Sequence, residues 1–333
     1  MNPFSNKRSL VVGAINIDRF YRVRSLEPYR KQPWWPRAGE TLLKPELREG
    51  VELLIKAEAA TAIHVGGGGQ AANFSIAAAA CGVEVTLFGT VGVDPAASIA
   101  LADLGDANLG LVQRTGRTTE AYIFVDPAGE RDILILASDA ELLPPTTKLT
   151  NNSDFQHAHF TSLPSIRDVE RQRRVFNLLP NTIFSLDIGA LYANLGHEPF
   201  ACLLGRLDVL FATQQELELF TRRPLDTAIE FLLDHNVKAI CCKHGAGGSV
   251  LYDSDGRSVR TQAPLVDAID TTGAGDVFAG VFVGASLRGA TKPKALRLAT
   301  DFASKSVSMW GRAAYPTKSE FVAALHAQHN LRS

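Results

Sequence analysis

The sequence lacks an excess of charge of either sign. Its 34 lysines and arginines almost balance 35 aspartates and glutamates, which leaves a net charge of -1 at pH 7 over 333 residues. Proteins that bind nucleic acid or anionic membranes generally carry a clear basic excess. The balance therefore argues against both kinds of partner and favours a small molecule.

Long apolar runs and paired cysteines are also missing. The N-terminal residues 1–8 lead directly into Leu10–Gly13, an apolar run too short for a signal peptide or a membrane span, and no other stretch is long enough. The four cysteines show no metal-ligand spacing, and the adjacent pair falls in a predicted buried strand. We expect reduced core cysteines and a cytoplasmic protein; the cysteines are Cys81, Cys202, Cys241 and Cys242.

A phosphate-binding loop of the Walker type, G-x-x-x-x-G-K-[ST], occurs nowhere. What the chain has is ample apolar content: with 46% hydrophobic and 21% charged residues it can bury a large core as one α/β domain. On the predicted strand around His157 and His159, alternation sends both imidazoles to one face. Because no third ligand lies nearby in sequence, we expect no metal there. Other apolar runs predict buried strands at residues 9–14, 85–89, 183–187, 209–212 and 239–243.

The most informative stretch is Asp270–Phe282. It reads Asp-Thr-Thr-Gly-Ala-Gly-Asp followed by an apolar run, so the chain turns from loop into helix just before Asp276. Backbone N–H groups at a helix N-terminus attract anions, and glycines let an anion come close. A lone acid there usually only stabilises the helix dipole. The small residues ahead of it favour phosphoryl transfer instead, with Asp276 as the base and the amides of Gly273, Ala274 and Gly275 as the anion hole.

A second glycine-rich run, Gly66–Asn73, precedes an alanine-rich helix at 74–81. Its spacing imitates a dinucleotide-binding fingerprint. The next predicted strand, 85–89, ends without the acid that would bind the ribose, which disfavours that interpretation. The glycines also suit close packing of a helix on a strand.

Together the two runs resemble the signatures of the ribokinase-like (PfkB) carbohydrate kinases. The C-terminal run resembles the stretch that leads into the catalytic Asp of that family, except that Val281 stands where the family usually has Ala or Gly. With Asn16 and Asp18 near the first strand, the resemblance spans nearly the whole chain. The N-terminal run matches the family at Gly68, Gly69, Ala71, Asn73, Ser75, Gly82 and Gly92.

The resemblance implies an α/β fold, namely a three-layer α/β/α domain with a mostly parallel central sheet and a small β-rich lid. It implies a single kinase domain over residues 1–333, with the lid formed by approximately 19–63 and 118–136. The residues themselves predict a hairpin in 118–136, around the turn Asp126–Gly129. The first lid segment is longer than in the simplest members, and its Trp34 and Trp35 suit a lid, a subunit interface or ordinary packing.

The resemblance also implies which residues bind the acceptor sugar. Taken alone, Asn16 and Asp18 are typical turn residues, but the matching family positions contact sugar hydroxyls, and a carboxylate can accept from two adjacent hydroxyls. Arg131 suits a charged or phosphorylated substrate, although it also reads as a solvated strand residue. The acceptor set implied by the resemblance is Asn16, Asp18, Gly68, Gly69 and Asn73.

For ATP, the glycine-rich turn after the strand 239–243 matches the nucleotide loop of the family, and Lys243 can neutralise phosphate charge. Many family members have an Asn and a Glu three residues apart after the strand 209–212; here Thr213 replaces the Asn and Glu216 remains. Glu216 is expected to act on Mg²⁺ through water. The alternative is that Glu216 is only an exposed residue in the first turn of a helix. A monovalent cation near Asp270 stays open. The helix and loop from Pro293 to Gly311 resemble the segment that covers the adenine. The implied nucleotide set is Lys243, Gly245, Gly248 and Thr272.

The function that we expect is ATP- and Mg²⁺-dependent phosphorylation of a hydroxymethyl group on a ketose, a furanose or a sugar acid. Ribose is not the first choice, because Leu163 stands where ribokinase carries an acidic sugar contact. The alternatives are an adenosine-like nucleoside kinase and a catalytically silent sugar-binding protein on the same fold. Lids of this family often pair, so a homodimer through the lid is a further expectation.

Overall fold

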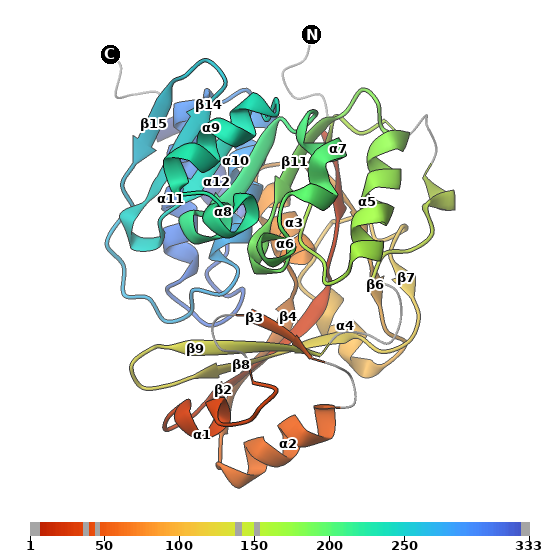
Figure 1. The fold of residues 1–333 in the computed structure, drawn as a ribbon, viewed down its shortest axis with the longest axis vertical. Coiled ribbons are helices and arrows are strands. Elements are labelled where there is room, and N and C mark those ends of the chain that lie inside the picture. Colours follow the sequence, from red (N-terminus) through yellow and green to blue (C-terminus); the bar gives the residue numbers. More distant parts are fainter. Residues whose placement is uncertain (1–6, 36–39, 44–46, 137–141, 150–153, 328–333) are drawn as a thin grey trace.

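The structure, a computed structural model, describes residues 7–35, 40–43, 47–136, 142–149 and 154–327. Its larger sheet has eight strands in the order β15-β14-β13-β12-β11-β10-β1-β5 (Figure 1). The strands from β13 to β5 in this order run parallel; β14 pairs antiparallel with β13 and with the edge strand β15. The mostly parallel central sheet is therefore confirmed. Its strands are β1 (Arg8–Val12), β5 (Glu84–Phe88), β10 (His157–Phe160), β11 (Ile183–Asp187), β12 (Val209–Thr213), β13 (Ala239–Lys243), β14 (Ser249–Asp253) and β15 (Ser258–Thr261).

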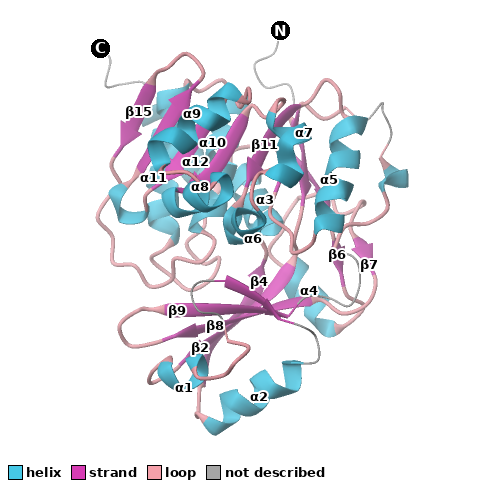
Figure 2. Ribbon diagram, viewed as in Figure 1, coloured by secondary structure: helices cyan, strands magenta, loops and turns pink. Residues whose placement is uncertain are grey.

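Helices cover both faces of this sheet, because its strands are apolar on both sides. On β1, Leu10 and Val12 enter one core while Val11 enters the other. Figures 1 and 2 show one group of helices in front of the sheet and the other behind it, which confirms the three-layer arrangement. The front group is α5 (Ile166–Leu178), α6 (Gly189–Leu195), α7 (Ala201–Leu204), α8 (Gln214–Thr221) and α9 (Leu225–Asp234); the other core takes residues from α3 (Gln70–Ala80), α4 (Pro95–Leu101), α10 (Ala274–Leu287), α11 (Lys292–Ser306) and α12 (Lys318–Ala327).

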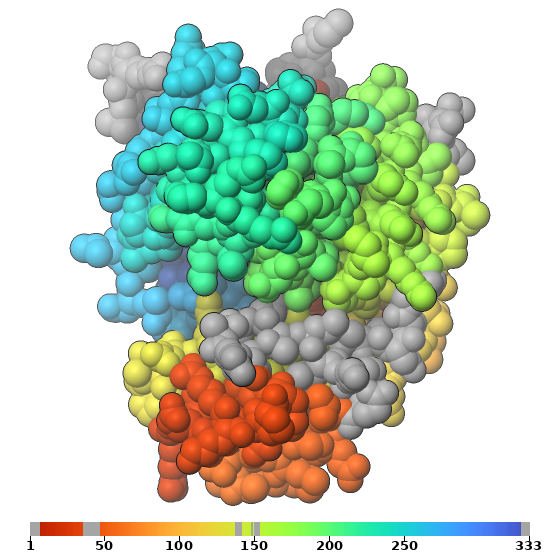
Figure 3. Space-filling view, in the orientation of Figure 1, coloured from red at the N-terminus to blue at the C-terminus, as the bar shows by residue number. Residues whose placement is uncertain are grey.

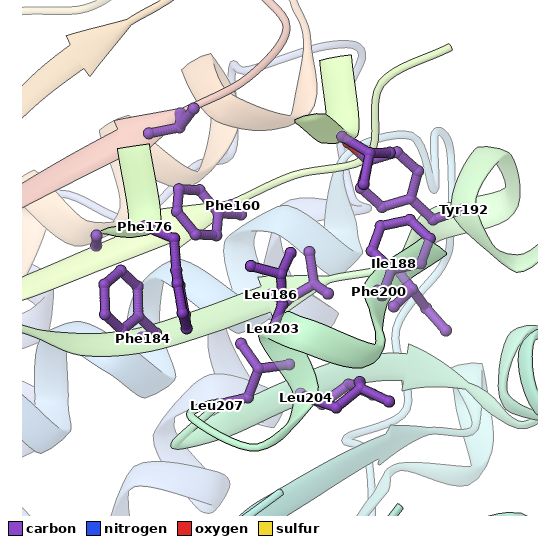
Figure 4. Packing of buried hydrophobic residues seen from close by; sticks show 14 of the residues in the cluster. Phe160, Phe176, Phe184, Leu186, Ile188, Tyr192, Phe200, Leu203, Leu204 and Leu207 are labelled. Atoms are coloured by element: carbon purple, nitrogen blue, oxygen red, sulfur yellow. The ribbon is translucent and has the colours of Figure 1, made fainter. Parts of the chain in front are cut away.

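The front core is rich in aromatic side chains. Phe184 packs on Phe176 and on Phe160, with ring centroids 4.3 and 5.7 Å apart, and a second group forms around Tyr192 and Phe200, 4.5 Å apart (Figure 4). Large side chains of this kind bury much apolar area each, so they hold the helical layer firmly on the sheet. The ends of the strands, and the site that they carry, thereby keep a fixed geometry.

A second, smaller sheet has the order β3-β9-β8-β2-β4. In the space-filling view, an early part of the chain, coloured red to orange, forms the lower end of the molecule (Figure 3). Asn16 and Asp18 lie in its strand β2, not in a turn, and Gly66–Gly68 form the end of its strand β4. Strands β8 and β9 form the predicted hairpin. The strands are β2 (Asn16–Arg22), β3 (Glu40–Leu43), β4 (Thr61–Gly68), β8 (Thr119–Val125) and β9 (Arg131–Leu136).

The outer face of the small sheet is covered by the chain's own insertion. Helices α1 (Glu27–Arg30) and α2 (Arg48–Ala57) pack there with Trp35 against Phe124 of β8. The Trp35 indole donates to an Asp132 carboxylate oxygen at 2.7 Å. Of the roles open for the tryptophans, Trp35 is thus a packing residue. The remaining short elements are β6 (Thr90–Val91), β7 (Gln113–Arg114), η2 (Thr146–Lys148), η3 (Glu198–Phe200) and η4 (Gly245–Gly247).

The paired histidines form a buried polar row with Ser185. His157 and His159 both lie within 2.9 Å of its hydroxyl, so they share one face as predicted. Burial lowers the pKa of both imidazoles, that of His157 to about 3, so they are neutral structural residues. The described residues contain no group of three or more His, Cys, Asp or Glu side chains that could hold a metal ion.

One cysteine differs from expectation. Cys81, Cys241 and Cys242 are buried, whereas Cys202 is exposed, because it lies on the outward side of the short helix α7. All four are free thiols. Among the helices that the structure describes, none combines the length and the apolar character that crossing a membrane requires.

Candidate active site

A cavity of about 600 Å³ lies where the small sheet faces the carboxyl ends of the central strands. Open α/β sheets bind ligands at this edge. The cavity brings together nearly all residues that the sequence indicated, although they come from both ends of the chain. Lining it are Asn16, Asp18, Gly69, Asn73, Glu216, Lys243, Gly245, Gly248, Thr272, Gly273, Ala274, Gly275 and Asp276. Gly68 does not line it.

Asp276 lies in the first turn of α10, with 8% of its surface exposed. The helix starts at Ala274, after Gly273 in the left-handed conformation at φ +76°. Glycine is required there for a second reason: a side chain would overlap the hydroxyl group of Tyr315. The carboxylate of Asp270 braces the loop, since it accepts from the amides of Thr272 at 2.9 Å and Gly311 at 3.0 Å.

Asp18 lies on β2 opposite Gly66 of β4, two residues before the end of that strand. Its carboxylate occupies the space where a side chain on Gly68 would be, so this glycine permits the close approach. Asn16 donates to Asp18 at 2.6 Å. Burial raises the pKa of Asp18 to about 7, against the opposing effect of the nearby Arg312 guanidinium, while Asp270 adds to the rise.

Asn73, on α3, connects the two signatures. Its amide nitrogen donates to a carboxylate oxygen of Asp276 at 2.9 Å, and its amide oxygen accepts from Arg312 at 2.9 Å. Arg312 also donates to the carbonyl of Gly68 at 3.0 Å. The sequence indicated Asn73 but not Arg312, which follows α11 in a loop that shows no signal of its own.

The positive charge of Lys243 is fixed at the other side of the cavity. Its ammonium group donates to Asp187 at 2.7 Å, and it lies so close to Gly275 that a side chain on that glycine would come within 3.0 Å of it. Although burial opposes the charge, Asp187 and Glu216 raise the pKa of Lys243, so it remains protonated. Asp187 was not predicted as a site residue; its position at the end of a parallel strand was the available signal.

Glu216 is half-buried and forms a capping box with Thr213 at the start of α8. Its carboxylate accepts from the Thr213 amide at 2.7 Å, while the Thr213 hydroxyl accepts from the Glu216 amide at 3.2 Å. The Thr that replaces the usual Asn is therefore a helix cap. Glu216 is not the exposed first-turn residue of the alternative reading.

Arg131, at the start of β9, extends from the small sheet to the loop that precedes α10. It donates to the Thr272 hydroxyl at 3.3 Å and lies 3.6 Å from Asp270. Only 31% of its side chain is exposed, so it is not a solvated strand residue. It places a cation between the small sheet and this loop.

Comparison with known proteins identifies the class of this chain. The sequence profile of the family described as "pfkB family carbohydrate kinase" matches residues 52–318. The chain therefore belongs to the PfkB family, and it is a carbohydrate kinase. The resemblance that the two signatures indicated is confirmed.

Individual relatives differ in their named substrates. The chain is 30% identical over 269 residues to an ATP-dependent ribose-1-phosphate kinase from Halopiger xanaduensis, covering 78% of this chain and 86% of that protein. It is 26% identical over 308 residues to a deoxyribokinase from Salmonella typhi, covering 86% and 91%.

Solved structures share the fold at lower identity. An adenosine kinase from Sinorhizobium meliloti superposes with a TM-score of 0.78 at 21% identity, covering 97% of this chain and 100% of that one. A ribokinase from Arabidopsis thaliana complexed with ribose and ATP gives a TM-score of 0.74 at 21% identity, covering 96% and 99%. These likenesses establish the ribokinase fold.

Proposed function

We propose that this carbohydrate kinase transfers the γ-phosphoryl group of ATP to a hydroxymethyl group of a sugar, with Asp276 as the general base. The observation that carries the proposal is the position of Asp276, a buried carboxylate in the first turn of α10 within one cavity that also contains the glycine-rich nucleotide loop and the polar acceptor residues. In this reaction Asp276 takes the proton of the acceptor hydroxyl. The hydroxyl oxygen then bonds to the γ-phosphorus as the bond to ADP breaks.

The start of α10 stabilises the negative charge on the transferred phosphoryl group. The amides of Gly273, Ala274 and Gly275 form the anion hole, since they are at the positive end of the helix. Lys243 adds its charge beside Gly275, and Thr272, Gly245 and Gly248 line the nucleotide side. Removing a single donor of this kind typically costs about 10²–10³-fold in kcat.

Magnesium fits this site as an ion carried by the nucleotide. The described acids do not form a cage of three or more metal-ligating side chains. Glu216 already uses one carboxylate oxygen for its cap. We therefore propose that Mg²⁺ is held by the phosphates and by water, with Glu216 contacting that water. When bound, the ion neutralises charge on the phosphates.

A monovalent cation at Asp270 is less well supported. Both oxygens of this carboxylate accept hydrogen bonds from backbone amides, of Thr272 and of Gly311. A site at Asp270 would have to share these oxygens. We propose no such activation.

On the acceptor side, we propose that Asp18 and Asn16 bind hydroxyl groups, together with the backbone of Gly69 and with Asn73 nearest the base; Gly68, which lies outside the cavity, has no such role. The wall beside these polar groups is largely aliphatic. Strands β8 and β9, which continue the small sheet next to β2, line the cavity with Ala121, Ile123, Ile133 and Ile135, together with Thr119 and Arg131. A furanose with an apolar face or substituent suits such a site. The same wall is the specific observation that keeps a nucleoside as the second candidate.

A dimer through the small sheet, which the resemblance allows, is constrained by the insertion. The outer face of the sheet is already buried by α1, α2 and Trp35. We propose that any pairing of this sheet between two copies uses its edge strands, of which β4 is one.

The test is coupled ADP release with Mg²⁺-ATP against neutral ketoses and aldoses, deoxyribose, sugar acids, ribose 1-phosphate and adenosine. Turnover with one class supports the kinase and identifies the acceptor, and turnover with adenosine alone would select the second candidate. Binding of a sugar without turnover, by a folded protein that also binds ATP, would instead indicate the catalytically silent binder.

A further inference from the structure

Arg312 is a half-buried cation whose hydrogen-bond partners are neutral. Its Nε atom donates to the Asn73 amide oxygen at 2.9 Å, and its Nη2 atom donates to the carbonyl of Gly68 at 3.0 Å. The third nitrogen, Nη1, is buried and has no hydrogen-bond partner among the described residues. Burial correspondingly lowers the pKa of Arg312. Burying a guanidinium in this way costs folding free energy, so its presence calls for a role.

The chemistry of arginine fixes which way the Asn73 amide points. Arginine has only donors, so the atom of Asn73 that it contacts must be the oxygen. The NH₂ group is then directed at Asp276, to which it donates at 2.9 Å. With the amide reversed, its oxygen would meet the Asp276 carboxylate, and two acceptors repel each other. Arg312 therefore selects the amide orientation that can hold the carboxylate.

The charge of Arg312 also acts at longer range. It lies near enough to Asp276 and Asp18 to be stabilised electrostatically by both carboxylates. One cation thus faces the carboxylate of the proposed base and that of the proposed acceptor site. Other groups around Asp276 include Lys243 and Tyr315, which interact with it electrostatically, and Asn73, which donates a hydrogen bond to it.

We propose that Arg312 and Asn73 are positioning residues for the phosphoryl transfer, in which Arg312 orients the Asn73 amide and the amide in turn holds the Asp276 carboxylate toward the acceptor. This inference rests on the proposed role of Asp276 as base. It assigns Asn73 a task beyond the sugar contact that the family resemblance implied. It also explains why a loop after α11 reaches the N-terminal signature, 239 residues away in sequence.

The experiment measures kcat, both KM values and the pH dependence of kcat for Arg312→Met, Arg312→Lys, Asn73→Ala and the double variant R312M/N73A. Loss of orientation should lower kcat by about 10–100-fold in R312M and in N73A, with the KM for ATP changed little. Because Arg312 acts through Asn73, the double variant should lie within about 3-fold of the slower single variant. The acid limb of the R312M profile should move to higher pH, and R312K, which keeps the charge, should leave the limb in place.

Arg206→Met is the matched control. Arg206 stacks on Phe176 at 4.2 Å and donates to the carbonyl of Leu179 at 3.2 Å, in the front core away from the cavity. Its loss should lower the melting temperature without moving the pH limb. A merely structural role of Arg312 would give the same result in R312M. The proposal would be overturned by any one of three results. They are an unmoved acid limb in R312M, a kcat of R312M within 3-fold of wild type, and effects of the two substitutions that multiply in the double variant.

Two further results keep the inference separate from the proposed function. If Asp276→Asn is inactive while R312M and N73A turn over at the wild-type rate, only the positioning role fails. If Asp276→Asn retains turnover, the assignment of the base fails first. Should R312M not fold, N73A and R312K still test the role, since the first removes the amide and the second leaves a single ammonium for two acceptors.

Discussion

At the scale of single residues, Asp18 combines burial with a polar task. Its pKa is raised to about 7 by burial, so the folded protein binds a proton that the unfolded chain, with an ordinary Asp, releases near pH 4. Protonated Asp18 therefore contributes fully to the stability of the fold below about pH 4, and this contribution is lost as the pH rises through about 7. In the absence of acceptor, ionised Asp18 should destabilise the fold.

We predict that Asp18→Asn is more stable than wild type at pH 8, with a difference that shrinks toward pH 4. From the size of the pKa shift, the difference should approach an upper limit on the order of 4 kcal/mol. Urea denaturation at several pH values measures it, with the exposed residue Asp106→Asn as the control. Parallel stability profiles of D18N and wild type would contradict the prediction.

Residues within the two signatures could be predicted from sequence, because short-range spacing carries them. The structure gathers Asn16, Asn73 and Asp276 in one cavity, as expected. Arg312 could not be predicted, since its partner Asn73 is remote in sequence and its own loop has no pattern. The cap between Thr213 and Glu216 was readable from the Thr-x-x-Glu spacing, which is typical of a capping box.

At the scale of elements, the packing of α10 on α3 sets the position of Asp276. Gly280 lies at the crossing, where an added side chain would come within 2.6 Å of the Phe74 carbonyl and 2.7 Å of the Ala77 side chain. The helices can approach closely only because this residue is glycine. Val281, which departs from the family pattern, is buried on the same helix.

We predict that Gly280→Ala destabilises the protein by about 1–3 kcal/mol, because overpacking forces the two helices apart. Kinetically it should also reduce kcat, since α10 carries the base. Urea denaturation and turnover measure both effects. The control is Gly205→Ala, where the nearest atom is 3.9 Å from the added carbon. Equal stabilities of the two variants would refute the account of this crossing.

The predicted strands agree with the observed ones where the sequence has a continuous apolar run. The strands at 183–187 and 239–243 lie within a residue of expectation because a fully buried strand needs an uninterrupted apolar run. The strand at Gly66–Gly68 was not predicted, because a glycine run carries no apolar pattern; its pairing with β2 makes it a strand. That pairing depends on residues far apart in the chain, which local propensity does not report.

At the scale of the whole molecule, Arg131 connects the small sheet to the loop that precedes α10 in the main domain. Alternation along β9 sends Arg131 into the cavity and Asp132 to the outer face, where Arg30 donates to it at 2.8 and 3.0 Å. Arg131 thus faces Asp270 on the cavity side of β9, whereas Arg30 pairs with Asp132 on the outer side. Their loss should have different consequences.

We predict that Arg131→Met lowers kcat at least about 10-fold with little loss of stability, because it removes a cation beside the proposed anion hole. Arg30→Met should do the reverse: about 1–3 kcal/mol of stability is lost, since buried Asp132 loses hydrogen bonds, and turnover by the folded protein is kept. Steady-state kinetics and urea denaturation of both variants provide the comparison. Similar effects of both on kcat would show that Arg131 acts only through the fold.

The measurement that tests the account most directly is single-turnover ADP formation by Asp276→Asn, with saturating Mg²⁺-ATP and the acceptor found in the panel. Asparagine keeps the shape of the side chain but cannot take the proton. The account predicts a rate about 10²–10⁴-fold below wild type, with folding and ATP binding unchanged. A near-wild-type rate from a correctly folded D276N would contradict it and require another base.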